Sequence, residues 1–138
     1  MHILPLQLRF NDIDMMGHVN NAVYMEFFDL GKEHYFTESG VDLYNDDFTM
    51  MIVHINVDFH SQVHFSDSIA CTTHIKRFGN KSIEFEQQIV ALNHDGTINE
   101  AVPSMATCST VLSGYSRSNA TSAPVPAEIK EKLARLSQ

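Results

Sequence analysis

The chain has 138 residues, which suits a single domain (residues 1–138), and its 43% hydrophobic and 19% charged content is that of a globular rather than a disordered protein. Seventeen acidic against nine basic residues give a formal net charge of −8, which disfavours a nucleic-acid partner because such a partner requires a basic face. Cys71 and Cys108 make no disulfide framework and no long apolar segment lies near the N-terminus, so we expect a cytoplasmic protein with no membrane partner.

The first predicted elements are a strand and a long helix. Apolar and polar residues alternate from Leu4 to Phe10, and Pro5 favours a position at a sheet edge. Asn20 or Asn21 is suited to cap a helix that runs without proline from Ala22 to Ser39.

The expected helix also carries packing signals. Gly31 indicates close packing of the backbone, since glycine inside a helix costs about 1 kcal/mol relative to alanine. Gly40 is a natural stop at the C-terminal end. Aromatic residues recur at helical spacing and make this helix a central core element: Tyr24, Phe27, Phe28 and Tyr35.

After the helix, the apolar period changes to two. Apolar residues from Val53 to Phe59 alternate with polar ones from His54 to His60, as in a strand with one buried face. Three further strands are expected, separated by the hairpin signals Gly79-Asn80 and Asp95-Gly96: residues 69–78, 82–92 and 97–112. Pro103 is expected to break the last strand, and Pro126 to begin a short amphipathic helix.

The order of these elements predicts an α+β fold. One helix cannot cover both faces of an antiparallel sheet, and the sheet edges need protection. A sheet wrapped around one long helix and continued into a second copy of the chain meets both needs.

The segment between the first strand and the helix carries the chemistry. It places Asp12, Asp14, Gly17, His18 and two asparagines just before a buried helix start. Free N–H groups at that start are suited to bind a developing oxyanion, and a nearby carboxylate to attack an acyl carbon or to activate water. The alternative interpretation is purely structural, with the aspartates in turns and the asparagines capping the helix.

This segment resembles the signature of the hotdog-fold thioesterases related to 4-hydroxybenzoyl-CoA thioesterase and to acyl-CoA and acyl-carrier-protein thioesterases. The matching residues are Asp12, Asp14, Gly17, His18, Val19, Asn20, Asn21 and Tyr24. The similarity continues more weakly from Val53 to Val90 and at Pro124 to Pro126.

The resemblance implies a role for each residue of the segment. Asp14 matches the catalytic carboxylate, as nucleophile or general base, and Asn21 the backbone N–H of the oxyanion hole. His18 and Asn20 match side chains that line the same pocket. Tyr24 is expected to pack against or orient the substrate, and Asp12 to be structural.

A coenzyme A site is implied near the hairpin at residues 76–82, across a subunit interface. Three of the nine basic residues, Lys76, Arg77 and Lys81, lie there, and such side chains suit phosphate. The alternative is an ordinary hairpin with solvated lysines. The expected substrate-binding residues are Gly17, Tyr24, Arg77, Gly79, Asn80, Lys81 and Ser82.

No metal and no cofactor are expected, with coenzyme A entering only as part of the substrate. The eight histidines lack the spacing of a metal site, and the two cysteines are read as core residues. Residues 42–51, rich in Asp and Met, are a candidate flap over an acyl tunnel.

The resulting expectation is an acyl-CoA thioesterase that acts as a homodimer or homotetramer. Alternatives are an acyl-carrier-protein thioesterase, a hotdog hydratase or dehydratase, and a non-catalytic acyl-thioester binding protein. The His18-Val19-Asn20 sequence departs from the histidine motif of the hydratases, and a binding protein has no use for the Asp14 carboxylate.

Overall fold

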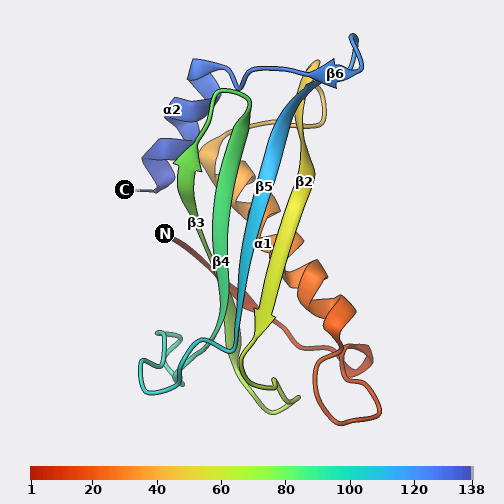
Figure 1. The fold of residues 1–138 in the computed structure, drawn as a ribbon. Coiled ribbons are helices and arrows are strands. Elements are labelled where there is room, and N and C mark those ends of the chain that lie inside the picture. The colour runs from red at the N-terminus through yellow and green to blue at the C-terminus, as the bar shows by residue number, and fades with distance from the viewer. Residues whose placement is uncertain (138) are drawn as a thin grey trace.

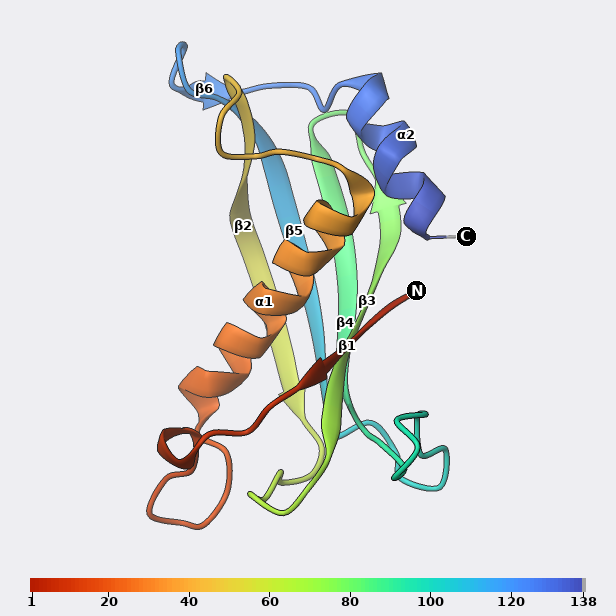
Figure 2. The same ribbon diagram turned by 180° about the vertical axis from the view of Figure 1, so that it is seen from behind.

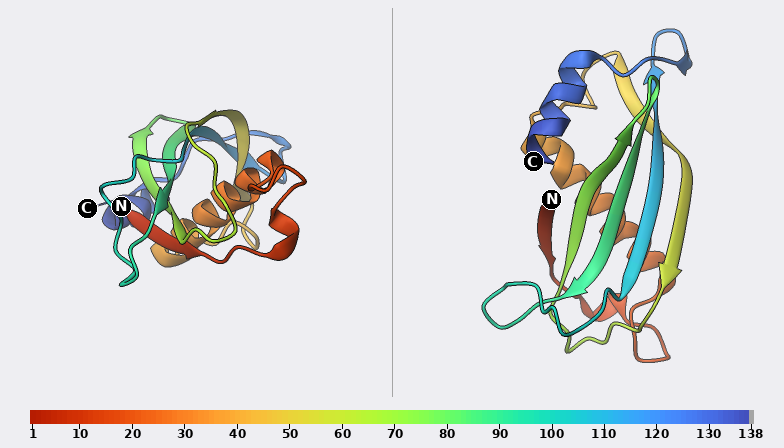
Figure 3. Two further views of the ribbon diagram at one scale, coloured as in Figure 1. Left: turned by 90° about the horizontal axis from the view of Figure 1, so that it is seen from below. Right: turned by 60° about the vertical axis from the view of Figure 1, so that its left-hand side comes forward.

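The computed structural model describes residues 1–137. One antiparallel sheet with strand order β1-β3-β4-β5-β2 curves around a single long helix (Figures 1 and 3). The elements in chain order are β1 (His2–Leu6), the 3-10 turn η1 (Phe10–Asp12), α1 (Asn21–Ser39), β2 (Phe48–Phe59), β3 (Ile69–Phe78), β4 (Ser82–Ala91), β5 (Ala106–Ser116), β6 (Thr121–Ser122) and α2 (Ala127–Leu136). The expected α+β hotdog architecture is confirmed, with the short β6 pairing with β5.

The central helix ends at the predicted Ser39 and begins at Asn21, one residue before the predicted start, with Asn20 as its cap. The Asn20 side chain accepts a hydrogen bond from the Ala22 N–H at 2.9 Å, and Gly40 ends the helix in the left-handed conformation with φ of 76°. Gly31 faces the sheet so closely that a Cβ there would lie 2.7 Å from both Cys71 Sγ and Gln87 Nε2. The predicted close packing of the helix is confirmed.

Two apolar clusters, one at each end of α1, form the core. The cluster around Phe28 joins the first half of α1 to the middle of the sheet. The cluster around Tyr35 and Phe85 joins the second half of α1 to α2, whose Leu133 is fully buried. The Tyr35 hydroxyl donates to the Leu133 carbonyl at 2.9 Å, which fixes the C-terminal helix on the central one.

Two strand boundaries expected from the sequence are wrong. The first strand ends at Leu6 rather than near Phe10, because the Asp12 carboxylate draws the chain into a 3-10 turn and leaves Phe10 86% exposed. The strand expected from residue 97 begins only at Ala106. Thr97 instead belongs to a tight turn, in which Asp95 Oδ1 accepts its N–H at 3.0 Å.

Strand β2 lies at the edge of the sheet and pairs only with β5. A bulge between Ile52 and His54 leaves Val53 without a partner in this ladder, so the expected strict alternation is broken there. Ile52, Val53 and Ile55 are 46%, 62% and 38% exposed. The strand expected to be half-buried is therefore an open apolar edge.

Within residues 1–137, no helix combines the length and the apolar character that a membrane crossing requires.

Candidate functional site

A tight loop before α1 holds the Asp14 carboxylate. Ile13 and Val19 form an isolated bridge, so the residues between them make a closed turn, and Gly17 adopts φ of 88° there. Asp14 Oδ1 accepts the Met16 N–H at 2.9 Å, and the Gly17 N–H donates to the Asp14 carbonyl at 3.0 Å. The carboxylate is thus fixed within the loop while its side chain stays 27% exposed.

The residue before this loop anchors it to the helix. The Asp12 carboxylate is 1% exposed and accepts the Arg9 backbone N–H at 2.8 Å and its guanidinium at 2.9 Å. The Asp12 carbonyl accepts the Asn20 N–H at 3.0 Å. These contacts agree with the structural role expected of Asp12.

His18 lies beside Asp14 at the end of the loop. Its Nδ1 is 3.9 Å from Asp14 Oδ1, and its ring meets that of His64 edge-on, with centroids 6.4 Å apart. The Asp14 carboxylate and the His18 ring are therefore neighbours within the loop.

The start of α1 offers an unused hydrogen-bond donor. The Ala22 N–H is capped by the Asn20 side chain, and the Val23 N–H donates to the Asn20 carbonyl. Within the described residues, 1–137, the Asn21 N–H makes no hydrogen bond. A free N–H at a helix start, supported by the helix dipole, is suited to bind an oxyanion.

Three of the predicted residues line one pocket of about 330 Å³ at this end of the molecule: His18, Asn21 and Tyr24. The opposite wall was missed by sequence reasoning and comes from the end of β2 and the residues after it: Phe59, His60, Ser61 and Gln62. The Tyr24 and Phe59 rings pack edge-on with centroids 5.0 Å apart. Asn20 caps the helix and does not line the pocket, and neither Asp14 nor Gly17 is among the lining residues; Asp14 reaches the pocket only through its neighbour His18.

Tyr24 is itself a buried wall of this pocket. Its side chain is 3% exposed, and burial raises the pKa of its phenol above the ordinary value. The phenol therefore stays protonated at neutral pH, which agrees with a packing or orienting role.

The structure does not bring the predicted coenzyme residues to this pocket. Arg77, Gly79, Asn80, Lys81 and Ser82 lie in the β3–β4 hairpin, at the end of the sheet opposite the Asp14 loop (Figures 1 and 2). Within one chain, the two groups of predicted site residues are therefore far apart.

The positive charge of this hairpin is largely paired. Arg77 contacts Glu84 at 2.9 Å, and Lys76 contacts Glu86 at 3.2 Å. Lys81 is exposed and makes no ion pair within residues 1–137. Lys81 is thus the cation of the hairpin that is best placed to meet a phosphate.

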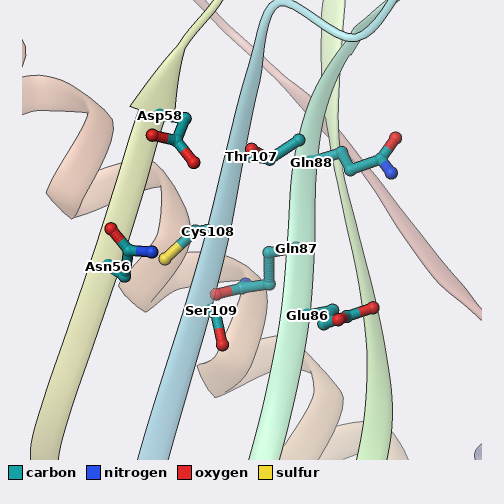
Figure 4. Close-up of a pocket in the computed structure, with 8 residues that line it drawn as sticks. All are labelled: Asn56, Asp58, Glu86, Gln87, Gln88, Thr107, Cys108 and Ser109. Atoms are coloured by element: carbon teal, nitrogen blue, oxygen red, sulfur yellow. The ribbon is translucent and has the colours of Figure 1, made fainter.

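A second pocket, of about 210 Å³, lies on the face of the sheet away from α1 (Figure 4). Its walls are polar side chains of β2, β4 and β5, among them Asp58, Glu86 and Ser109. It contains none of the predicted site residues. Among residues 1–137, no three His, Cys, Asp or Glu side chains gather as a metal site.

The cysteines are not nucleophiles in this arrangement. Burial raises the pKa of Cys71 to about 12 and also raises that of Cys108. Both thiols therefore stay protonated at neutral pH, in agreement with their expected role in the core.

Comparison with known proteins identifies the sequence family of the chain and solved structures with the same fold. Residues 8–133 match the sequence model of the family described as the thioesterase-like superfamily. No curated protein sequence matches the chain significantly.

Solved structures share the fold over nearly the whole chain. The PA5185 protein of Pseudomonas aeruginosa is 26% identical with a TM-score of 0.83, and the match covers 100% of this chain and 92% of that one. An Asp-to-Asn variant of 4-hydroxybenzoyl-CoA thioesterase, complexed with 4-hydroxybenzoyl-CoA, is 17% identical with a TM-score of 0.82 and coverages of 96% and 97%. A Thermus thermophilus thioesterase complexed with coenzyme A and Zn is 24% identical with a TM-score of 0.76 and coverages of 98% and 92%.

Proposed function

Because the chain belongs to the thioesterase-like superfamily, we propose that it hydrolyses an acyl-CoA thioester to the free acid and coenzyme A. The observation that carries the proposal is the Asp14 carboxylate, fixed in the loop that leads into α1, together with the Asn21 N–H at the start of that helix, which is free among residues 1–137. A base and an oxyanion donor are the two groups that thioester hydrolysis requires.

Two routes are open to Asp14. In one, the carboxylate attacks the carbonyl carbon, the thiolate leaves, and water hydrolyses the resulting mixed anhydride. In the other, the carboxylate takes a proton from water as the water attacks the carbonyl carbon, and the thiolate leaves when the tetrahedral intermediate collapses. In both, the Asn21 N–H binds the negative oxygen of the tetrahedral intermediate, and His18 lies close enough to orient the carboxylate.

The similar 4-hydroxybenzoyl-CoA thioesterase supports this assignment. That structure is of an Asp-to-Asn variant in complex with 4-hydroxybenzoyl-CoA, which fits a protein that needs an aspartate to turn its thioester over. The Thermus thermophilus thioesterase with coenzyme A supports coenzyme A as the carrier. The net charge of −8 further disfavours an acidic carrier protein.

A homodimer would complete the site. β2 is a long edge strand with exposed apolar residues, and such an edge is normally covered. Antiparallel pairing of β2 with its copy, about a two-fold axis, would continue the sheet. The same axis would carry the β3–β4 hairpin of one subunit, with Arg77 and Lys81, toward the Asp14 end of the other.

Thiol release from a panel of acyl-CoAs, from acetyl to palmitoyl with benzoyl and phenylacetyl, tests the proposal. Asp14→Asn removes the base and keeps the shape, so we expect a loss of at least about 100-fold in kcat with substrate binding retained. Asp95→Asn, in the exposed turn after β4, is the matched control and should behave as wild type.

Two outcomes would contradict the proposal. Full activity in Asp14→Asn would show that the site is wrong. No turnover of any member by folded wild-type protein would favour an acyl-carrier-protein substrate or a non-catalytic binding role.

A further inference from the structure

A row of exposed apolar side chains on β2 marks a path, here called the groove, that leads away from the Asp14 end of the molecule. α1 crosses the inner face of the sheet from the Asp14 end toward the loop before β2, and the edge strand β2 returns in the opposite direction (Figure 2). Ile52, Ile55 and Phe59 pair with the buried residues Leu112, Thr110 and Ala106 of β5, so they share the face of the sheet that carries the helix. They nevertheless remain 46%, 38% and 47% exposed.

The far end of this groove is a cavity of about 270 Å³ between α1, β2 and the loop that joins them. Five apolar side chains line it: Phe36, Leu43, Met50, Ile52 and Leu112. The other walls are two cations, Lys32 and Arg117, two carboxylates, Asp29 and Glu33, and the hydroxyl-bearing Tyr44 and Thr49. The cavity therefore combines an apolar lining with a balanced set of charges.

Lys32 is the unusual member of this lining, because it is only 5% exposed. An ammonium group has three N–H donors. Gln87 Oε1 accepts one at 3.1 Å, and the mostly exposed Asp29 carboxylate lies 3.5 Å away. Among residues 1–137, Lys32 Nζ makes no further hydrogen bond, so at least one donor of a buried charge is left for a ligand.

The other cation is already occupied. The Arg117 guanidinium donates to the backbone carbonyls of Leu43, at 2.6 Å, and of Asp46, and so holds the loop between α1 and β2. Arg117 is exposed and holds the loop, whereas Lys32 is buried in the cavity wall and keeps a donor free.

We propose that the acyl chain lies in the groove between α1 and β2, and that Lys32 binds a neutral oxygen, a hydroxyl or keto group, near the distal end of that chain. This inference rests on the proposed function and names its substrate class. A neutral oxygen fits better than a carboxylate, because Asp29 and Glu33 already balance the two cations of the cavity.

The length of the chain follows from the helix. Lys32 lies eleven residues after Asn21, and helical side chains lean toward the N-terminus, so the ammonium is roughly 10 to 16 Å along the axis from the oxyanion donor. At about 3.5 Å for every three bonds of an extended chain, this span corresponds to roughly nine to fourteen bonds. The substrates are then oxygenated acyl groups of medium to long chain.

The test compares three acyl-CoAs of this length: unsubstituted, ω-hydroxylated and ω-carboxylated. We expect wild type to favour the hydroxylated thioester at least about tenfold in kcat/KM, since a hydrogen bond to a charged donor is among the stronger ones. Lys32→Met should abolish the preference, mainly through KM, while Lys32→Arg should retain it. Lys130→Met, on α2, is the matched control and should match wild type.

Three outcomes would overturn the inference. They are a wild-type preference for the unsubstituted chain, a preference for the carboxylated chain, and an equal loss on all three substrates in folded Lys32→Met. Ile52→Trp provides a second variant that does not disturb the buried lysine. Since Ile52 is half-exposed at the groove, this variant should slow long chains and spare acetyl-CoA, and an equal effect on both would also count against the groove.

A calorimetric titration separates this inference from the proposed function. If wild type hydrolyses none of the three thioesters, the proposed function fails, but their binding can still be measured. At least about tenfold tighter binding of the hydroxylated thioester, lost in Lys32→Met, would support the groove without any catalysis. Equal binding of all three would refute it.

Discussion

Replacement of Gly31 by alanine probes the contact between α1 and the sheet. The added Cβ would lie 2.7 Å from Cys71 Sγ, 2.7 Å from Gln87 Nε2 and 3.0 Å from Thr73 Oγ1. These atoms have little freedom to move, because Gln87 Nε2 already donates to the Phe28 carbonyl at 2.8 Å and to Thr73 Oγ1 at 3.0 Å.

The expected change in stability is the sum of opposing effects. Alanine gains about 1 kcal/mol over glycine in helix propensity. Overpacking a close contact costs about 1 to 3 kcal/mol. Displacing the Gln87 amide weakens two buried hydrogen bonds, each worth about 1 kcal/mol. We therefore expect Gly31→Ala to lower the free energy of unfolding by about 1 to 4 kcal/mol.

Thermal unfolding measures this change directly. At roughly 3 °C per kcal/mol for a chain of this size, Tm should fall by roughly 3 to 12 °C. Cys71→Ala removes the Sγ contact. Adding Gly31→Ala to a Cys71→Ala background should therefore cost less stability than adding it to wild type. An unchanged or higher Tm in Gly31→Ala would refute the close approach of helix and sheet.

Two further predictions concern the sheet edge and the buried thiol. Val53→Lys places a charge at the bulge of β2, so light scattering after gel filtration should show a shift from dimer to monomer. The control Gln88→Lys, on the central strand β4, should leave the dimer intact. A dimer in both variants would exclude pairing through β2. With its pKa raised to about 12, Cys71 should resist thiol reagents at pH 8 until the protein unfolds, and rapid labelling of native protein would contradict its burial. Because the pKa of this thiol is near its ordinary value of 9.0 in the unfolded chain and about 12 in the folded one, stability should fall progressively as pH rises from about 9 to about 12.

The elements that the sequence predicts best are those whose signals are local. The Asn20 cap and Gly40 define α1, and the turn at Gly79 separates β3 from β4, so these boundaries follow from neighbouring residues. The first strand was predicted too long because a side-chain contact, between Arg9 and Asp12, ends the extended chain. Alternation alone carries no information about such a contact.

The sequence predicts only those residues of the candidate site that are close neighbours along the chain. Asp14, His18 and Asn21 lie within eight residues, and the loop bridge keeps them at one end of the molecule. The opposite wall, from Phe59 to Gln62, arrives by tertiary structure: the Val19 N–H donates to the Val63 carbonyl at 2.8 Å and joins the two segments. A hydrogen bond between residues so distant in sequence has no local sequence pattern that would predict it.

The strand order also determines how the chain can assemble as it is made. Within residues 1–137, β2 pairs with β5 alone, although β3 and β4 lie between them in the sequence. Since translation adds roughly 5 to 20 residues per second, the apolar β2 leaves the ribosome on the order of several seconds before its partner exists. Pairings between distant segments also form slowly. Nascent chains of this topology therefore pass through a period in which their most apolar edge is open to chaperones and to other chains.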